Sequence, residues 1–240
     1  MNVLITGGSS GVGEAITRRS ATELNNKVYF TYNNSLKNSK QIEADHPNTK
    51  AIKCDFKNKN DIAKLTNKIV ELDIDVLINN AYSGQFLESH FHKTPLDNFI
   101  TGFDNNIVPT ISITQAAIGV FRKKKFGKII TILSAALINT PPLGSSVYVA
   151  NKAYLEELTK VWAVENIKFN ITSNSISPAF MITGFTNSMD ERLVEQITNG
   201  HPLKKLLTTE EVAESVEFLM NATQQINGIN LILNSGVSIK

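Results

Sequence analysis

The chain has 240 residues, of which 42% are hydrophobic, and 24 basic against 22 acidic residues give a formal net charge of +2. This ordinary globular composition excludes collagen, a disulfide scaffold and a disordered chain, and the near-neutral charge argues against a nucleic-acid-binding protein. No apolar run reaches the roughly 18–20 residues that cross a bilayer. We therefore expect one domain spanning 1–240 in a soluble, cytoplasmic protein without a membrane partner.

Seven short apolar runs alternate with longer stretches that carry apolar residues at helical spacing. The runs cover 3–5, 28–30, 51–54, 76–78, 129–133, 171–176 and 229–233, and the helical stretches cover 12–24, 61–72, 96–121, 148–164 and 209–220. Runs that are apolar on both faces are typical of buried parallel strands. We expect Pro109 to kink the long third helix or to mark an irregular first part. Thr208, followed by acidic residues, predicts the cap of the last helix.

This alternation predicts the fold class: α/β, a single-domain Rossmann-type doubly wound parallel sheet of about seven strands flanked by helices. In such sheets, ligands bind outside the carboxyl ends of the strands, where the strand order reverses. The candidate functional residues are therefore those that follow the apolar runs.

A glycine-rich turn, T-G-G-S-S-G-V-G at residues 6–13, follows the first run. Its glycines allow a tight turn and a close approach to a pyrophosphate, and the next helix offers free N–H groups and a partial positive charge. The spacing differs from the commoner G-x-G-x-x-G fingerprint. A glycine loop without a ligand is the alternative interpretation.

The second run ends in T-Y-N-N-S-L-K, residues 31–37, which contain no carboxylate. A carboxylate at this place would hydrogen-bond the adenosine ribose and repel a 2′-phosphate. Its absence favours NADP(H) over NAD(H) and makes Asn33 and Asn34 candidate contacts of the cofactor. The alternative is a polar loop whose Lys37 faces solvent.

Tyr148 and Lys152 are four residues apart and share one face of a helix. A neighbouring cation lowers the pKa of a phenol from about 10 toward the range useful for proton transfer at neutral pH. Ser134 ends the fifth run, where its hydroxyl can donate to a substrate oxygen. Asn106 lies inside a helical stretch that disfavours asparagine, so either a function or an amide that is exposed or bonded to a carbonyl explains it.

These motifs occur over the whole chain in the order typical of short-chain dehydrogenases/reductases, and the sequence resembles their single-domain branch. The resemblance implies a nicotinamide cofactor, NADP or alternatively NAD, and no metal. It implies the following cofactor-binding residues: Gly7, Ser9, Ser10, Gly11, Val12, Gly13, Asn33, Asn34, Asp55, Phe56, Asn79, Ala81, Tyr148, Lys152, Pro178, Ala179 and Thr183.

The resemblance also implies a catalytic group of four residues for hydride transfer between the nicotinamide and a carbonyl or alcohol carbon. Tyr148 would donate the proton and Ser134 would stabilise the developing alkoxide. Lys152 would lower the pKa of Tyr148 and hold the nicotinamide ribose. Asn106 would position a water molecule that supplies protons to Lys152.

Three departures from the family pattern concern the substrate rather than the reaction class. Tyr82 follows Asn79-Asn80-Ala81, where the family has a glycine, and adds a bulky ring near the cofactor. Ala179 replaces the glycine after Pro178. Asn234-Ser235 stand where the family more often has an acid and a glycine.

A substrate lid is expected at approximately 180–207, with a second wall at 135–144. The apolar lid residues suit an apolar or acyl-chain substrate or merely pack the lid onto the body. They are Phe180, Met181, Ile182, Phe185, Met189, Leu193 and Ile197.

Among family members of this length, the chain is similar to 3-oxoacyl-(acyl carrier protein) reductases, which implies a carrier-bound substrate. A basic run at 122–128 would dock the acidic carrier protein through Lys123, Lys124, Lys125 and Lys128, or it is a solvated helix end. The resemblance further implies a homotetramer or homodimer built on the helices at 96–121 and 148–164. Trp162 either anchors that interface or lies in the core.

Two alternatives to a 3-oxoacyl reductase stay open. One is a dehydrogenase of the same family that acts on a free alcohol or ketone, such as a steroid, sugar, polyol or specialised metabolite. The other is a catalytically silent dinucleotide-binding sensor. The presence of both Tyr148 and Lys152 speaks against the sensor.

Overall fold

The computed structural model describes residues 1–186 and 190–237. Its strands are β1 (Asn2–Ile5), β2 (Lys27–Tyr32), β3 (Thr49–Lys53), β4 (Val76–Asn79), β5 (Gly127–Ile132), β6 (Ile171–Pro178) and β7 (Asn230–Leu233). These form one parallel sheet in the order β3-β2-β1-β4-β5-β6-β7. The predicted doubly wound sheet of seven strands is confirmed.

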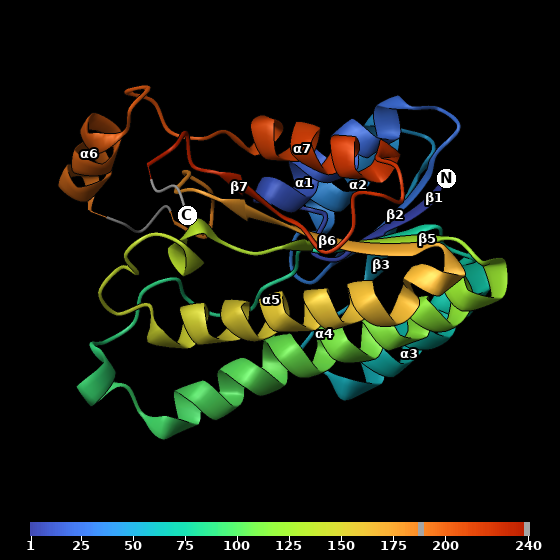
Figure 1. Cartoon of the computed structure of the whole chain (residues 1–240), viewed down its shortest axis with the longest axis horizontal. Helices are drawn as coiled ribbons and strands as arrows, with labels where there is room; N and C mark the ends of the chain where they lie inside the picture. Colours follow the sequence, from blue (N-terminus) through green and yellow to red (C-terminus); the bar gives the residue numbers. More distant parts are fainter. Residues whose placement is uncertain (187–189, 238–240) are drawn as a thin grey trace.

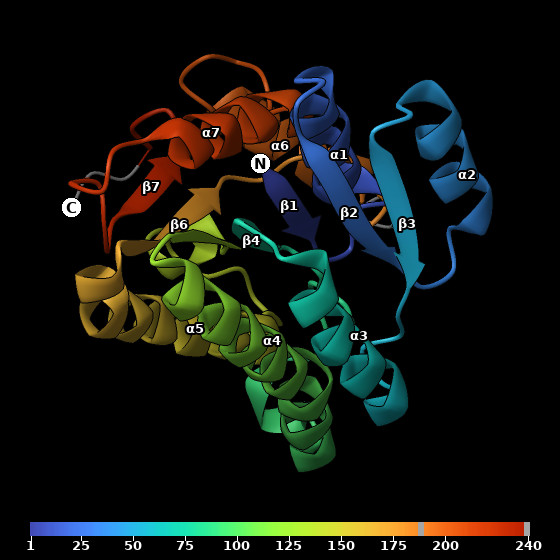
Figure 2. The same cartoon turned by 90° about the vertical axis from the view of Figure 1, so that its right-hand side faces the viewer.

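Two layers of helices cover the sheet. The α-helices are α1 (Gly11–Thr22), α2 (Leu36–Asp45), α3 (Lys59–Leu72), α4 (Leu96–Lys124), α5 (Ser146–Asn166), α6 (Glu191–Gly200) and α7 (Thr209–Asn221). Figure 2 shows α1, α2 and α7 on one face of the sheet and α3, α4 and α5 on the other. Short 3₁₀ turns occupy Phe91–Lys93, Ala135–Leu137 and Ile167–Phe169.

The alternation of side chains along each strand divides the core between these layers. Val3 and Ile5 pack with α1 and α7, while Leu4 between them packs with α3 and α4. All three are fully buried, because both faces of a parallel sheet are covered.

Most helix predictions hold, with differences that have physical reasons. Helix α4 continues through Pro109, which is buried within it. Helix α7 begins with a capping box, in which Thr208 accepts from the backbone of Glu211 and the Glu211 side chain accepts from the backbone of Thr208. Helix α2 was not predicted, because Leu36 and Ile42 are its only large apolar residues and give no stripe.

The strand order reverses between β1 and β4. The connection after β1 leads to α1 on one face of the sheet, and the connection after β4 leads to α4 on the other face. There the backbone N–H of Thr6 donates to the Ile78 carbonyl, and the Thr6 hydroxyl accepts from the N–H of Asn80. The first glycine-rich turn and the segment after β4 are therefore tied together at the carboxyl edge of the sheet.

Candidate active site

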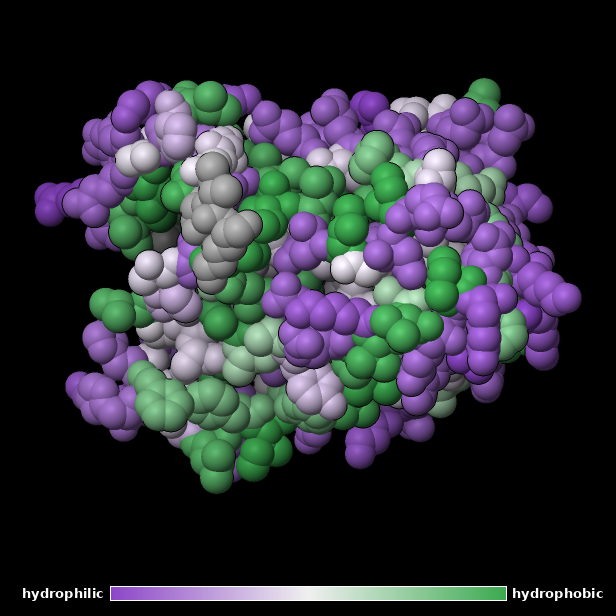
Figure 3. Space-filling view, in the orientation of Figure 1, coloured by the Kyte–Doolittle hydropathy of each residue, from purple (hydrophilic) through white to green (hydrophobic). Residues whose placement is uncertain are grey.

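A cavity of about 730 Å³ lies at the carboxyl ends of the strands. Figure 3 shows the surface hollowed on the side of α6. Nearly all the predicted site residues line this cavity, from Gly7 in the first turn to Thr183 in the lid. Only Asn79 and Asn106 among them lie outside it.

The glycine-rich turn is held in a conformation that side chains could not adopt. Gly7 has φ +65° and its backbone packs against Ala81. A Cβ on Gly13 would lie 2.0 Å from the Gly7 carbonyl oxygen. The Asn80 amide donates to the carbonyls of Thr6 and Gly7, at 2.9 and 3.1 Å. Asn80 is thus a positioning residue that was not among the predicted contacts, although its motif was recognised.

The same turn offers unpaired donors to an anion. Ser10 caps α1 with extended backbone, but its hydroxyl makes no capping hydrogen bond. The first N–H groups of α1 and the Ser10 hydroxyl face the cavity edge, where the helix carries partial positive charge. The turn has no side chains at Gly7 and Gly13, so a ligand can approach its backbone closely, and the start of α1 offers free hydrogen-bond donors. Both features fit the pyrophosphate of a dinucleotide.

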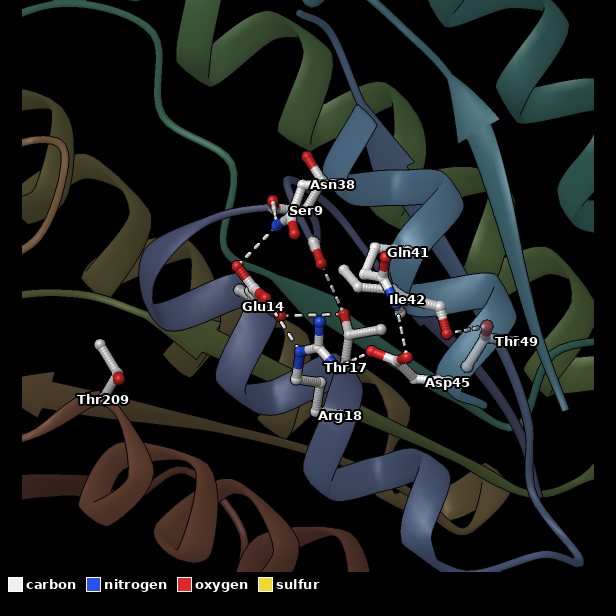
Figure 4. A network of polar contacts seen from close by, with 12 residues as sticks. Ser9, Glu14, Thr17, Arg18, Asn38, Gln41, Ile42, Asp45, Thr49 and Thr209 are labelled. Carbon is white, nitrogen blue, oxygen red and sulfur yellow. Dashed lines mark hydrogen bonds and ion pairs between the residues drawn. The ribbon is translucent and has the colours of Figure 1, made fainter. Parts of the chain in front are cut away.

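A polar network fixes α2 against this turn (Figure 4). The Asn38 amide donates to the Ser9 carbonyl and to Glu14, both at 2.7 Å. Arg18 bridges Glu14 and Asp45 at 2.9 and 2.8 Å. Both carboxylates raise the pKa of Arg18 through hydrogen bonds, Asp45 first. The residues that follow β2 and line the cavity, where they can meet a ribose, are Asn33, Asn34 and Ser35.

Cys54 and Asp55 line the cavity where β3 ends. Burial raises the pKa of the Cys54 thiol to about 12. The thiol is therefore protonated at neutral pH and is no nucleophile.

Ser134, Tyr148 and Lys152 converge on the opposite side of the cavity. Ser134 follows β5 and begins a 3₁₀ turn, in which its oxygen accepts from the N–H of Ala136. Tyr148 and Lys152 lie one turn apart on α5, and both are buried. The Lys152 ammonium donates to the Ile132 carbonyl at 2.6 Å. Strand β5 and helix α5 thus bring together three groups suited to protonate a carbonyl oxygen.

The predicted lowering of the Tyr148 pKa by Lys152 is wrong for this arrangement. Burial raises the pKa of Tyr148, and a hydrogen bond with Ser134 acts in the opposite direction. The Lys152 ammonium lies 5.8 Å from the centroid of the Tyr148 ring and is turned to the Ile132 carbonyl. Tyr148 is therefore a protonated phenol at neutral pH, which is the form that a proton donor needs.

The pH profile of reduction is expected to report Lys152, because burial lowers its pKa to about 8. The ammonium is present below this value and is lost as the pH rises through it, whereas Tyr148, with its raised pKa, stays protonated. We expect kcat/KM for the reduced cofactor to fall above about pH 8, since this parameter reports groups of the free enzyme. A kcat/KM profile that stays flat up to about pH 10 would show that reduction does not require the ammonium form of Lys152.

Asn106 is buried and uses its side chain to hold the segment after β4. Its Oδ1 accepts from the N–H of Ser83 at 2.6 Å, and its amide donates to the carbonyls of Ser83 and Gly102. The expected carbonyl-bonded amide is thus confirmed and the exposed one is wrong, and the side chain positions the segment that carries Tyr82.

Comparison with known proteins agrees with this geometry. A family model described as "Enoyl-(Acyl carrier protein) reductase" matches residues 7–238. A "3-oxoacyl-[acyl-carrier-protein] reductase FabG" of Rickettsia prowazekii is 32% identical, with 98% of this chain and 95% of that protein covered. A solved "short chain dehydrogenase/reductase family protein" superposes with a TM-score of 0.86 at 29% identity, covering 98% of this chain and 96% of the other.

This chain belongs to the short-chain dehydrogenase/reductase family. It is an NAD(P)H-dependent oxidoreductase, and its cofactor is a nicotinamide dinucleotide. A solved structure titled "Crystal structure of a putative betaketoacyl-ACP reductase" is also similar, with a TM-score of 0.84 at 28% identity over 98% of this chain and 97% of that one.

A set of aromatic rings surrounds Tyr148. Tyr82 and Phe86 follow β4, and Phe185 belongs to the lid. Burial raises the pKa of the Tyr82 phenol to about 12, so this second tyrosine stays protonated. Phe86 was not predicted, because a lone phenylalanine in a loop gives no signal in the sequence.

The predicted lid contains α6 and partly lines the cavity. Leu193 and Ile197 of α6 and Phe180, Met181 and Phe185 before it face the cavity, whereas Ile182 is exposed. Met189 lies outside the described residues. Figure 1 shows α6 standing away from the sheet beside the carboxyl ends of the strands.

The predicted basic docking surface needs correction. Lys128 is buried in β5 and donates to the Ala222 carbonyl at the end of α7, so it cannot meet a partner. Lys124 is paired with Asp73 and Asp75. Lys123 and Lys125 are exposed, but they lie at the amino end of β5, opposite the cavity, as the far end of α4 in Figure 1 shows.

The outer faces of α4 and α5 carry exposed apolar residues. They include Ile100, Val108, Val161 and Val164. Trp162 is buried in the core cluster with Ile171 and Phe121, so the core interpretation of this residue is confirmed. Among the described residues, none of the helices combines the length and apolar character required to traverse a bilayer.

Proposed function

We propose that this enzyme reduces the 3-oxo group of an acyl thioester bound to acyl carrier protein, using NADPH. The convergence of Ser134, Tyr148 and Lys152 at one end of a cavity whose other end fits a dinucleotide supports the reaction. The relatives named as 3-oxoacyl reductases support the substrate class.

The residues of the chain would carry the proton and the charge in this reaction. Tyr148 gives its phenolic proton to the carbonyl oxygen, and Ser134 donates a hydrogen bond to the same oxygen as it becomes an alkoxide. When bound, the nicotinamide supplies the hydride to the carbonyl carbon. Lys152 holds the nicotinamide ribose, and its ammonium returns a proton to the phenolate after the transfer. Asn106 keeps the segment 82–83 in place and positions a water molecule that feeds protons to Lys152.

Direct assay of cofactor oxidation tests the proposal. The enzyme is mixed with NADPH or NADH and a short 3-oxoacyl thioester, and the loss of absorbance of the reduced nicotinamide is followed. We expect turnover with NADPH preferred. Cofactor binding without turnover of thioesters, but with turnover of free ketones or alcohols, would favour the dehydrogenase alternative. Binding without turnover of any carbonyl or alcohol would favour a silent sensor.

The NADPH preference is proposed from the end of β2, where Asn33 and Asn34 line the cavity and no carboxylate is present. We expect Asn33→Asp to lower kcat/KM for NADPH by about ten-fold or more and to leave kcat/KM for NADH within about three-fold. Ser35→Asp, two residues further along the chain, tests whether the effect depends on position. Equal losses for both cofactors would show that Asn33 does not face the 2′-phosphate.

The carrier protein and the oligomeric state complete the proposal. Docking of the carrier at the basic run stays a prediction for the exposed Lys123 and Lys125 alone.

The exposed apolar faces of α4 and α5 support a homotetramer or homodimer, which light scattering on the purified protein would measure. A reducing, cytoplasmic location suits the single Cys54.

A further inference from the structure

Three aromatic rings from two separate segments enclose the ring of Tyr148. The centroids of Tyr82 and Phe86 each lie 5.1 Å from that of Tyr148, and the centroid of Phe185 lies 5.8 Å away. We propose that these three rings select substrates whose carbonyl carbon carries a flat aromatic group over substrates with a straight acyl chain. This inference rests on the proposed carbonyl reduction and names the substrate class for the same site.

The three rings lie where they would contact the substituent on the carbonyl carbon of the substrate. The carbonyl oxygen has to reach the hydroxyls of Tyr148 and Ser134 for proton transfer. Tyr82, Phe86 and Phe185 line the same cavity as these two hydroxyls. A substituent next to the carbonyl therefore lies against aromatic rings.

The rings also hold one another in place. Phe185 of the lid lies 5.7 Å from Tyr82, edge to face, and 6.2 Å from Phe86. The Lys152 ammonium lies 5.4 Å from the Tyr82 ring centroid, which adds a cation–π contact. Asn106 holds the backbone of Ser83 next to Tyr82. The wall of the cavity next to Tyr148 is thus built from mutually packed rings, and aliphatic lid residues such as Leu193 and Ile197 line the cavity as well.

A wall of this kind favours flat ligands for two physical reasons. An aromatic substituent gains edge-to-face or offset contacts with each neighbouring ring. A straight acyl chain gains no such contacts and loses rotational freedom when rigid rings confine it.

The test compares two thioesters of N-acetylcysteamine that differ in this substituent alone: benzoylacetyl and the straight-chain butyrylacetyl. We expect kcat/KM for the benzoylacetyl thioester to exceed the other by about ten-fold or more in the wild-type enzyme. Phe86→Leu and Phe185→Leu are each expected to lower this ratio by at least about three-fold, whereas Phe185→Tyr, which keeps a ring, preserves it.

A matched control is Phe218→Leu, because Phe218 is an exposed phenylalanine on α7 outside the cavity. It should leave the ratio unchanged. The ratio is insensitive to a general loss of folded protein, since both substrates are measured on the same preparation. A wild-type ratio at or below one, or a ratio unaffected by both leucine variants, would overturn the selection of aromatic substrates and leave the proposed reductase intact. Failure to reduce either thioester would instead overturn the proposed function, and this inference with it.

Discussion

Tyr148→Phe is expected to lower kcat for carbonyl reduction by about a thousand-fold while the affinity for NADPH changes by less than about three-fold. The variant keeps the buried ring that packs against Tyr82 and Phe86 but lacks the proton that the carbonyl oxygen needs. Because burial raises the pKa of Tyr148, the wild-type phenol carries this proton at neutral pH. Single-turnover kinetics and a fluorescence titration with NADPH would measure the two effects.

Tyr154→Phe serves as the control for this variant. Tyr154 lies on the same helix, is 44% exposed and packs against Phe103 outside the cavity. Removal of its hydroxyl should leave kcat within about two-fold, as surface substitutions rarely matter more. If Tyr148→Phe kept more than about a tenth of the wild-type kcat, another group would have to supply the proton.

Gly13→Ala is expected to weaken NADPH binding by more than about ten-fold, because small displacements in a positioned site have large effects. The new Cβ would lie 2.0 Å from the Gly7 carbonyl oxygen and 2.5 Å from the Asn80 amide nitrogen. One of these groups must move, and Gly7, at φ +65° against Ala81, has no space to do so. Such overpacking also lowers the free energy of unfolding by about 1–3 kcal/mol.

Thermal unfolding with and without NADPH measures both effects at once. Gly119→Ala is the matched control, because Gly119 lies exposed inside α4 and a Cβ there would meet no atom within 4 Å. That variant should gain about 0.5–1 kcal/mol of stability, since alanine is the better helix former. Equal NADPH-induced shifts in Tm for Gly13→Ala and the wild type would show that the turn does not bind the cofactor.

Much of the site followed from local spacing in the sequence. The turn at 6–13 lies at the end of β1, and the i, i+4 pair Tyr148 and Lys152 lies on one helix, so neither depends on distant parts of the chain. The capping box at Thr208 is equally local. Helix α2 escaped prediction because its polar sequence has no apolar period, and it is held instead by Asn38, which binds Ser9 and Glu14 across the fold.

The strand–helix alternation and the candidate cofactor-binding and catalytic residues could be predicted from the sequence, because hydrophobic period and glycine spacing are properties of short segments. The surroundings of these residues depend on how distant segments pack together in the folded chain. This packing buried Lys128 and Trp162, raised rather than lowered the pKa of Tyr148, and brought Phe185 against Tyr82 across the cavity. Burial and ring contacts arise between residues far apart in the chain, and no local pattern encodes them.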